Sequence, residues 1–100
     1  MSRYTISPEA SHDLDEISDY FANRNIEAGE RFVEEFDKRC RNLINFPNMG
    51  RSYEEIDPFL RGVALKGYII LYRSRNNAIE IVRVVRGERD LPMLFSDDRE

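Results

Sequence analysis

Residues 61–86, RGVALKGYIILYRSRNNAIEIVRVVR, decide the fold of this 100-residue chain. They contain three runs rich in valine, isoleucine and tyrosine, at 61–66, 68–74 and 78–86, and this composition is typical of β-strands. Gly67 separates the first two runs and the polar residues 75–77 separate the last two, and both junctions suit tight turns. The segment therefore predicts three consecutive strands folded as an antiparallel meander.

Two helices are expected before the meander. Ser7 followed by Pro8 is a helix-start signal, and the sequence predicts a first helix over about residues 8–23. Its apolar side chains recur every three or four residues, at Ala10, Leu14, Ile17 and Phe21. Asn25 is a suitable N-cap for a second helix over about residues 26–45, whose apolar stripe is Ala28, Phe32, Phe36, Cys40 and Leu43. The short connection predicts an antiparallel helical hairpin.

A short strand is also expected at residues 3–6, so the predicted element order is β-α-α-β-β-β. This order indicates an α+β fold, with a helical hairpin packed on a mostly antiparallel sheet. The length corresponds to one domain, which we expect over residues 1–95, followed by a short charged tail at 96–100.

The composition favours a cytoplasmic protein. No apolar run approaches the ~20 residues of a membrane helix, so no membrane partner is expected. The amino terminus lacks the apolar core of a signal peptide. Cys40 is the only cysteine, which excludes an internal disulfide and fits a reducing compartment. Its place in the apolar stripe predicts a buried thiol rather than a reactive one.

Charge is distributed unevenly along the chain. The net charge is −4, yet residues 1–60 are acidic whereas residues 61–95 carry more bases than acids. Of the 15 basic residues only Lys38 and Lys66 are lysine, and arginine suits fixed contacts to carboxylates and other anions. A broad nucleic-acid surface usually comes with a clearly basic domain. The pattern thus favours a local protein-binding or anion-binding site, without sequence-specific binding of nucleic acid by this chain alone.

Several motifs in order resemble one known family. SPEA, DLDEISDY, FPNMG, LRG, YIILYR and IVRVVRGERDLPMLF together are similar to the RelE/ParE toxins of bacterial type II toxin–antitoxin modules, over nearly the whole chain. The resemblance implies a small cytoplasmic toxin that a cognate antitoxin neutralises by wrapping an extended segment around it. It also implies one of two activities: RelE-like members cut messenger RNA on ribosomes, whereas ParE-like members poison DNA gyrase.

The residues favour the ParE-like branch. RNA cleavage needs an acid and a base as well as cations, and arginine is a poor proton carrier because it stays protonated. The only histidine, His12, lies in the first predicted helix, and the last tyrosine, Tyr72, lies inside a predicted strand. We therefore expect no catalytic residues, no metal and no cofactor. The alternatives are a RelE-like endoribonuclease with an unusual arginine-based site, or a non-toxic member that only binds antitoxin.

The candidate contacts to the antitoxin or to gyrase are arginines and an apolar tail. The arginines, which we expect to converge at one side of the sheet, are Arg61, Arg73, Arg83, Arg86 and Arg89. The expected hydrophobic anchor consists of Leu91, Met93, Leu94 and Phe95. The alternative is a solvated edge with local pairs such as Arg86–Asp90 or Arg73–Glu80, and a tail that closes the core.

Two further expectations concern the surface. The acids of the first helix, Asp13, Asp15, Glu16 and Asp19, are interpreted as a solvated face. Arg83 shares strand parity with Ile79, Ile81 and Val85, so it is either the exposed member of that row or it needs a partner.

Overall fold

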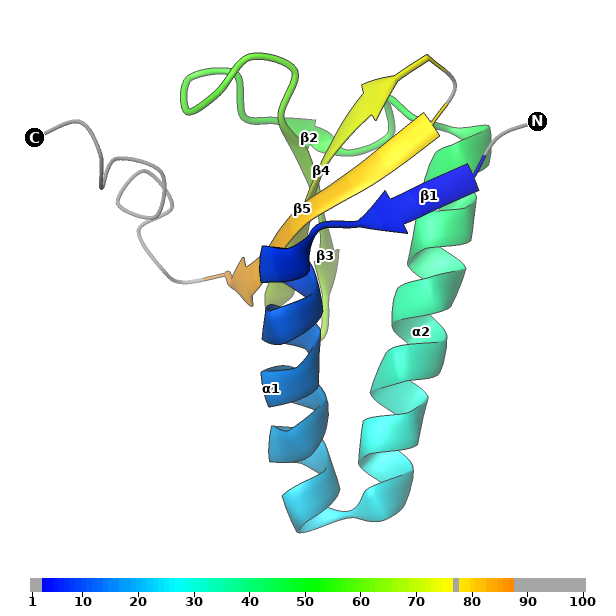
Figure 1. Ribbon diagram of the computed structural model, residues 1–100, viewed down its shortest axis with the longest axis vertical. Coiled ribbons are helices and arrows are strands. Elements are labelled where there is room, and N and C mark those ends of the chain that lie inside the picture. Colours follow the sequence, from blue (N-terminus) through cyan, green and yellow to red (C-terminus); the bar gives the residue numbers. More distant parts are fainter. Residues whose placement is uncertain (1–2, 77, 88–100) are drawn as a thin grey trace, which may run out of the picture.

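The computed structural model describes residues 3–76 and 78–87, which form two helices and a five-stranded sheet (Figure 1). Along the chain the elements are β1 (Arg3–Ile6), α1 (Pro8–Arg24), α2 (Ile26–Asn45), β2 (Arg51–Ser52), β3 (Arg61–Leu65), β4 (Tyr68–Arg75) and β5 (Ala78–Arg86). The two helices lie side by side as an antiparallel hairpin (Figure 1). The predicted domain boundary at residue 95 and the tail at 96–100 lie outside the described residues.

The sheet has the strand order β1-β5-β4-β3-β2, in which β1 runs parallel to β5 and every other pair is antiparallel. The predicted α+β fold, a helical hairpin on a mostly antiparallel sheet, is confirmed. β2 was not expected. It contains only two residues, paired with Gly62 and Arg61, and so short a strand has no hydrophobic period to detect.

Local signals set the helix ends and the first hairpin. The Ser7 side chain accepts the Ala10 N–H at the start of α1, and Asn25 caps α2 by accepting the Glu27 N–H at 2.8 Å. Between β3 and β4, Lys66 and Gly67 both have positive φ, at 49° and 85°. A two-residue hairpin turn of this kind matches the twist of its strands, and glycine adopts the conformation without a steric cost.

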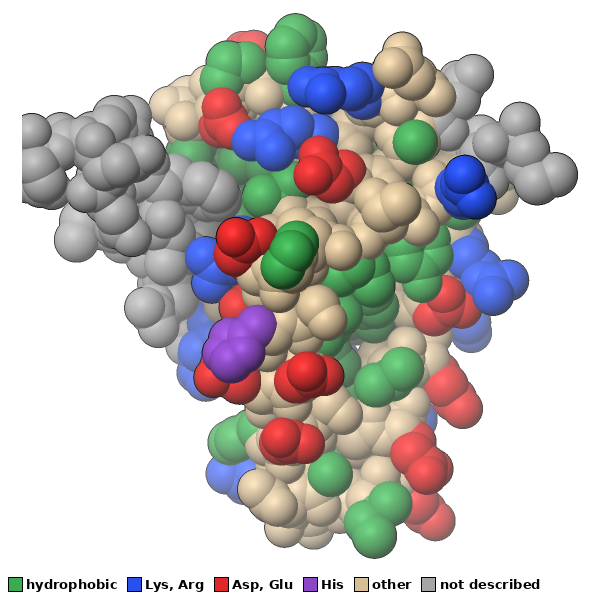
Figure 2. Space-filling view, viewed as in Figure 1, with side chains coloured by type: hydrophobic (Ala, Val, Ile, Leu, Met, Phe, Trp, Pro, Cys, Tyr) green, Lys and Arg blue, Asp and Glu red, His purple; other side chains and the backbone are tan. Residues whose placement is uncertain are grey.

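The main core lies between the helices and one face of the sheet. Its most buried members are Ala10, Phe32, Cys40, Leu43, Ile70, Tyr72 and Ile81. Burial raises the pKa of the Cys40 thiol to about 12, so this residue behaves as a small apolar side chain, as predicted. Acidic side chains gather on the outer faces of the helices, with apolar side chains visible between them (Figure 2). Neither helix in the described part of the chain has the length and apolar composition needed to cross a membrane.

A smaller core lies on the opposite face of the sheet, under the loop that joins β2 to β3. It consists of Tyr53, Leu60, Leu71 and Val85. β5 contains a β-bulge, since Leu71 pairs with Arg83 whereas the next residue, Tyr72, pairs with Ile81. The extra residue shifts the alternation of side chains. The expectation that Val85 shares a face with Ile79 and Ile81 is therefore wrong.

The Tyr72 hydroxyl joins the end of α2 to the sheet. It donates to the Pro47 carbonyl at 2.7 Å and accepts the Gly50 N–H at 3.0 Å. A Cβ at Gly50 would lie only 2.6 Å from this hydroxyl oxygen, so the corner has room only for glycine. Burial raises the pKa of the Tyr72 phenol, which keeps the proton on the donor.

We predict that Tyr72→Phe lowers the free energy of unfolding by about 1–3 kcal/mol, because it leaves two backbone groups at this corner without their partner. Urea denaturation followed by circular dichroism measures the change. Tyr20→Phe is the matched control, since Tyr20 is 45% exposed and should leave the midpoint unchanged. Equal stability of the Tyr72→Phe variant and the parent chain would contradict this role of the hydroxyl.

Candidate partner-binding site

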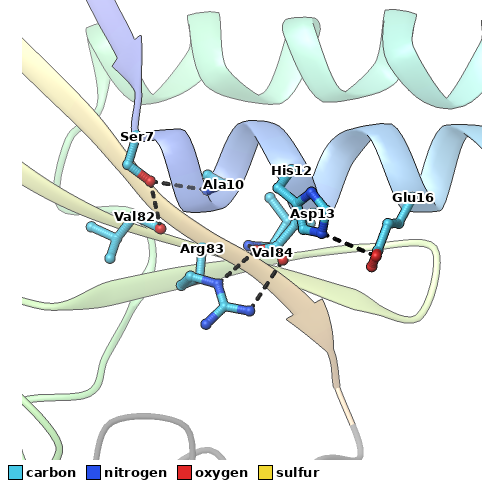
Figure 3. Close-up of polar contacts among 8 residues, drawn as sticks. All are labelled: Ser7, Ala10, His12, Asp13, Glu16, Val82, Arg83 and Val84. Carbon is cyan, nitrogen blue, oxygen red and sulfur yellow. Dashed lines mark hydrogen bonds and ion pairs between the residues drawn. The ribbon is translucent and has the colours of Figure 1, made fainter.

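The outer edge of β5 is covered partly by a strand and partly by a helix. β1 pairs only with Ala78–Ile81, and α1 then packs along the remainder of β5. Ser7, between β1 and α1, donates its N–H to the Ile81 carbonyl at 2.9 Å. Its hydroxyl donates to the Val82 carbonyl, also at 2.9 Å (Figure 3). The same hydroxyl oxygen caps α1. Ser7 therefore extends the ladder of β5 while it starts the helix.

Asp13 continues this edge from the next turn of α1. Its Oδ2 accepts the Val84 N–H at 3.0 Å and the Arg83 Nε–H at 2.7 Å, and its Oδ1 accepts an Arg83 Nη2–H at 3.1 Å (Figure 3). The Asp13 side chain is only 11% exposed. These hydrogen bonds raise the pKa of Arg83, even though its burial acts in the opposite direction. The result is a fixed, bidentate ion pair between Arg83 and Asp13.

The expectation that Asp13 belongs to a solvated acidic face is wrong, because α1 packs this carboxylate against the edge of β5. A signal for its position was present in the sequence. Asp13 stands three residues after Ala10 and four before Ile17, which places it beside the apolar stripe of the helix. Glu16 does lie at the surface, where it pairs with exposed His12 at 3.1 Å. The predicted need of Arg83 for a partner is met by Asp13.

A pocket of about 240 Å³ opens beside this ion pair. It is lined by Asp13, Glu16, Tyr68, Arg83, Val84, Val85 and Arg86. Two carboxylates therefore stand beside two guanidinium groups, and the wall of the pocket is close to electrically neutral. The Tyr68 ring packs against the core, with its centroid 5.8 Å from that of Phe32.

Two other arginines of the predicted patch, Arg61 and Arg73, bind acceptors away from this pocket. Arg61 donates to the Gly50 carbonyl at 2.7 Å and also reaches the Asn48 carbonyl at 3.3 Å. Arg73 forms an ion pair with Asp57 in the β2–β3 loop, although Glu80 lies opposite it in the sheet. The expectation that all these arginines converge on one patch is therefore wrong for the described residues. Arg83 and Arg86 line one pocket, whereas Arg61 and Arg73 are held by acceptors within residues 48–57.

Part of the predicted site lies outside the described residues. Arg89 and the apolar residues Leu91, Met93, Leu94 and Phe95 follow the last described position, residue 87. Arg86, at the end of β5, is exposed and lines the pocket.

Comparison with known proteins identifies relatives over most of the chain. A family model described as the ParE toxin of the type II toxin–antitoxin system parDE matches residues 4–91. Toxin ParE1 of Mycobacterium tuberculosis is 29% identical over 92 residues, covering 90% of this chain and 94% of the relative. Toxin ParE3 of Caulobacter vibrioides is 26% identical over 92 residues, covering 91% and 92%.

A solved structure also has the same fold. A chain of the chromosomal ParDE system from P. aeruginosa superposes with a TM-score of 0.72 at 24% identity, covering 88% of this chain and 97% of the other. The arrangement of helices and sheet is thus shared over nearly the full length of both chains.

We predict that Asp13→Ala lowers the free energy of unfolding by about 1–3 kcal/mol, because it leaves the Arg83 side chain and the Val84 N–H without an acceptor. Asp15→Ala on the exposed side of the same helix is the control and should have little effect. Chemical denaturation of Asp13→Ala, of Arg83→Ala and of the double variant measures the coupling, with Asp15→Ala run beside them. Additive effects of the two substitutions would show that the ion pair does not hold α1 to β5.

Proposed function

Because this chain belongs to the ParE toxin family of type II toxin–antitoxin systems, we propose that it arrests growth by binding DNA gyrase and not by cutting RNA. The chain is a ParE-type toxin, and the resemblance drawn from its sequence motifs implies gyrase as the target. Gyrase acts on the chromosome, so the proposed site of action is the cytoplasm.

The near-neutral pocket at the α1–β5 junction is the observation that supports binding over RNA cleavage. A ribonuclease site must hold a phosphate with surplus positive charge and move protons between donors and acceptors. Here the Arg83 guanidinium is already paired with the Asp13 carboxylate, and Glu16 adds a second carboxylate to the pocket. His12 pairs with Glu16 at the surface, and the Tyr72 hydroxyl is committed to the Pro47 corner. A polyanion would therefore meet no surplus of positive charge at this site.

An antitoxin is the second partner of a type II toxin, and we propose that an acidic part of it contacts Arg86. This exposed side chain stands at the rim of the pocket, at the end of the last strand. Arg89 and Leu91–Phe95 follow it directly in the chain and remain candidates for the same interface. Apolar contacts would supply most of the affinity, and charge pairs would orient the antitoxin.

We predict that the purified chain inhibits supercoiling by DNA gyrase and leaves messenger RNA intact in a translation reaction. A gel assay of plasmid topology measures the first activity, and primer extension on a translated message measures the second. The small protein encoded beside the toxin should reverse the inhibition of gyrase when the two are mixed.

Ribosome-dependent cleavage of the message without any effect on supercoiling would assign the chain to the nuclease branch. Adding the partner in both assays is the internal control, because a specific activity must disappear when the complex forms.

For the antitoxin contact, we predict that Arg86→Glu weakens binding of the antitoxin at least about tenfold, since like charges at an interface are costly. Arg75→Glu is the matched control, because Arg75 is also an exposed arginine at a strand end but lies at the opposite end of the β4–β5 hairpin. Titration calorimetry with both variants gives the two dissociation constants. Equal affinities would remove Arg86 from the interface.

A further inference from the structure

The loop between β2 and β3 ends in a turn that presents an aromatic ring to solvent. The Leu60 N–H donates to the Asp57 carbonyl at 3.1 Å, which closes a four-residue turn with Pro58 at its second position. Phe59, at the third position, has φ of 68°. Turns with proline at the second position and positive φ at the third normally place glycine at that third position, because a Cβ is disfavoured in that conformation.

Packing does not account for phenylalanine at this position. Phe59 is 80% exposed, which is the largest value among the exposed large hydrophobic residues of the described chain. The ring therefore contributes little to the core, while its backbone adopts a conformation that costs free energy. A strained and exposed bulky residue is a reason to look for a role in binding.

Contacts at the base of the β2–β3 loop fix the position of the turn. The Tyr53 N–H donates to the Leu60 carbonyl at 2.8 Å, and both residues are buried in the smaller core. Arg73 of β4 forms an ion pair with Asp57, the first residue of the turn. Since the backbone that carries Phe59 is anchored on both sides, the ring is presented in a defined position. Such preorganisation lowers the entropic cost of binding.

The surface around the ring is polar and nearly neutral. A pocket of about 320 Å³ lies beside Phe59, and its polar lining consists of Asn48, Ser52, Glu54, Arg61 and Ser74. One acid and one base stand among neutral groups, so the surface lacks the excess of positive charge that a nucleic acid requires. An apolar centre with a polar rim is instead the anatomy of a protein–protein interface.

We propose that Phe59 is the aromatic anchor by which this toxin binds its protein target, inserting into an apolar pocket on the surface of that target. The inference rests on the proposed function, in which the toxin acts by binding. The turn lies near Ser74, towards the end of β4, whereas Arg86, the proposed antitoxin contact, pairs with Tyr68 at the start of the same strand. The two partners would thus meet different ends of the sheet. In Figure 1 the β2–β3 loop projects beyond the strands, where a partner can reach it.

Substitutions at Phe59 that suit the turn provide the test. Phe59→Gly and Phe59→Asn both tolerate positive φ, so they remove the ring without straining the backbone. We expect both variants to melt no lower than the parent chain and to bind the antitoxin as before. Growth arrest on induction should be lost, with about a thirtyfold loss of affinity for the target, as expected for removal of a hot-spot aromatic residue. Phe59→Tyr keeps the ring and should remain toxic.

The control is Tyr20→Ala, which removes an exposed aromatic ring from α1 and should leave growth arrest unchanged. A folded Phe59→Gly variant that is fully toxic would overturn the proposal. Loss of antitoxin binding in that variant would overturn it too, because the ring would then serve neutralisation. A marked fall in the melting temperature of both the glycine and the asparagine variants would show that Phe59 is a structural residue.

Growth arrest does not depend on which protein the toxin attacks. If the parent chain arrests growth without inhibiting supercoiling, gyrase is not the target and the proposed function fails in that respect. The loss of arrest in Phe59→Gly would still support the anchor, now for another protein. If growth arrest persists in Phe59→Gly, only the proposed role of Phe59 fails, even where gyrase inhibition by the parent chain is established.

Discussion

The outer edge of β5 is the constraint on which the rest of the structure depends. β4 satisfies one edge of this strand, but β1 is too short to satisfy the other. Backbone groups left at such an edge cost free energy and invite pairing with other chains. Ser7 donates to carbonyls of β5 and Asp13 accepts a backbone N–H of β5, where a longer β1 would have done so. The axis of α1 is thereby fixed along β5, and α2 follows through the hairpin.

This solution determines what the arginines do. Arginine has a planar fork of donors that suits carboxylates and carbonyl oxygens, and three arginines of the predicted patch, Arg61, Arg73 and Arg83, use it inside the molecule. Arg83 binds Asp13, Arg73 binds Asp57, and Arg61 binds the carbonyls of Asn48 and Gly50. The charges of Arg73 and Arg83 are therefore neutralised by carboxylates in the fold, and the Arg61 guanidinium is held by carbonyl oxygens. This use of the arginines within the fold supports the proposed binding of a protein target.

Much of the fold could be predicted because its signals are local. N-caps at Ser7 and Asn25, the spacing of apolar residues in both helices, and the turn at Gly67 all act within a few residues of the chain. The candidate site was less predictable. Which acid pairs with Arg83 depends on residues 70 positions apart in the sequence, and strand parity gave the wrong face for Val85 because a bulge intervenes. The spacing of apolar residues places Asp13 beside the core-facing stripe of α1, but neither its pairing with Arg83 nor the bulge has a signal in nearby residues.

The sequence by itself determined the main helices and strands, their order and the family. These follow from short-range periodicity and from several short motifs that occur in the order typical of the family. Only the tertiary structure decided that Asp13 is a largely covered partner of Arg83 and not a solvated acid. It also decided that the arginines divide between two parts of the sheet, and that Phe59 stands exposed at a strained turn. These properties depend on which segments the fold brings together, and those contacts exist only once the chain has folded.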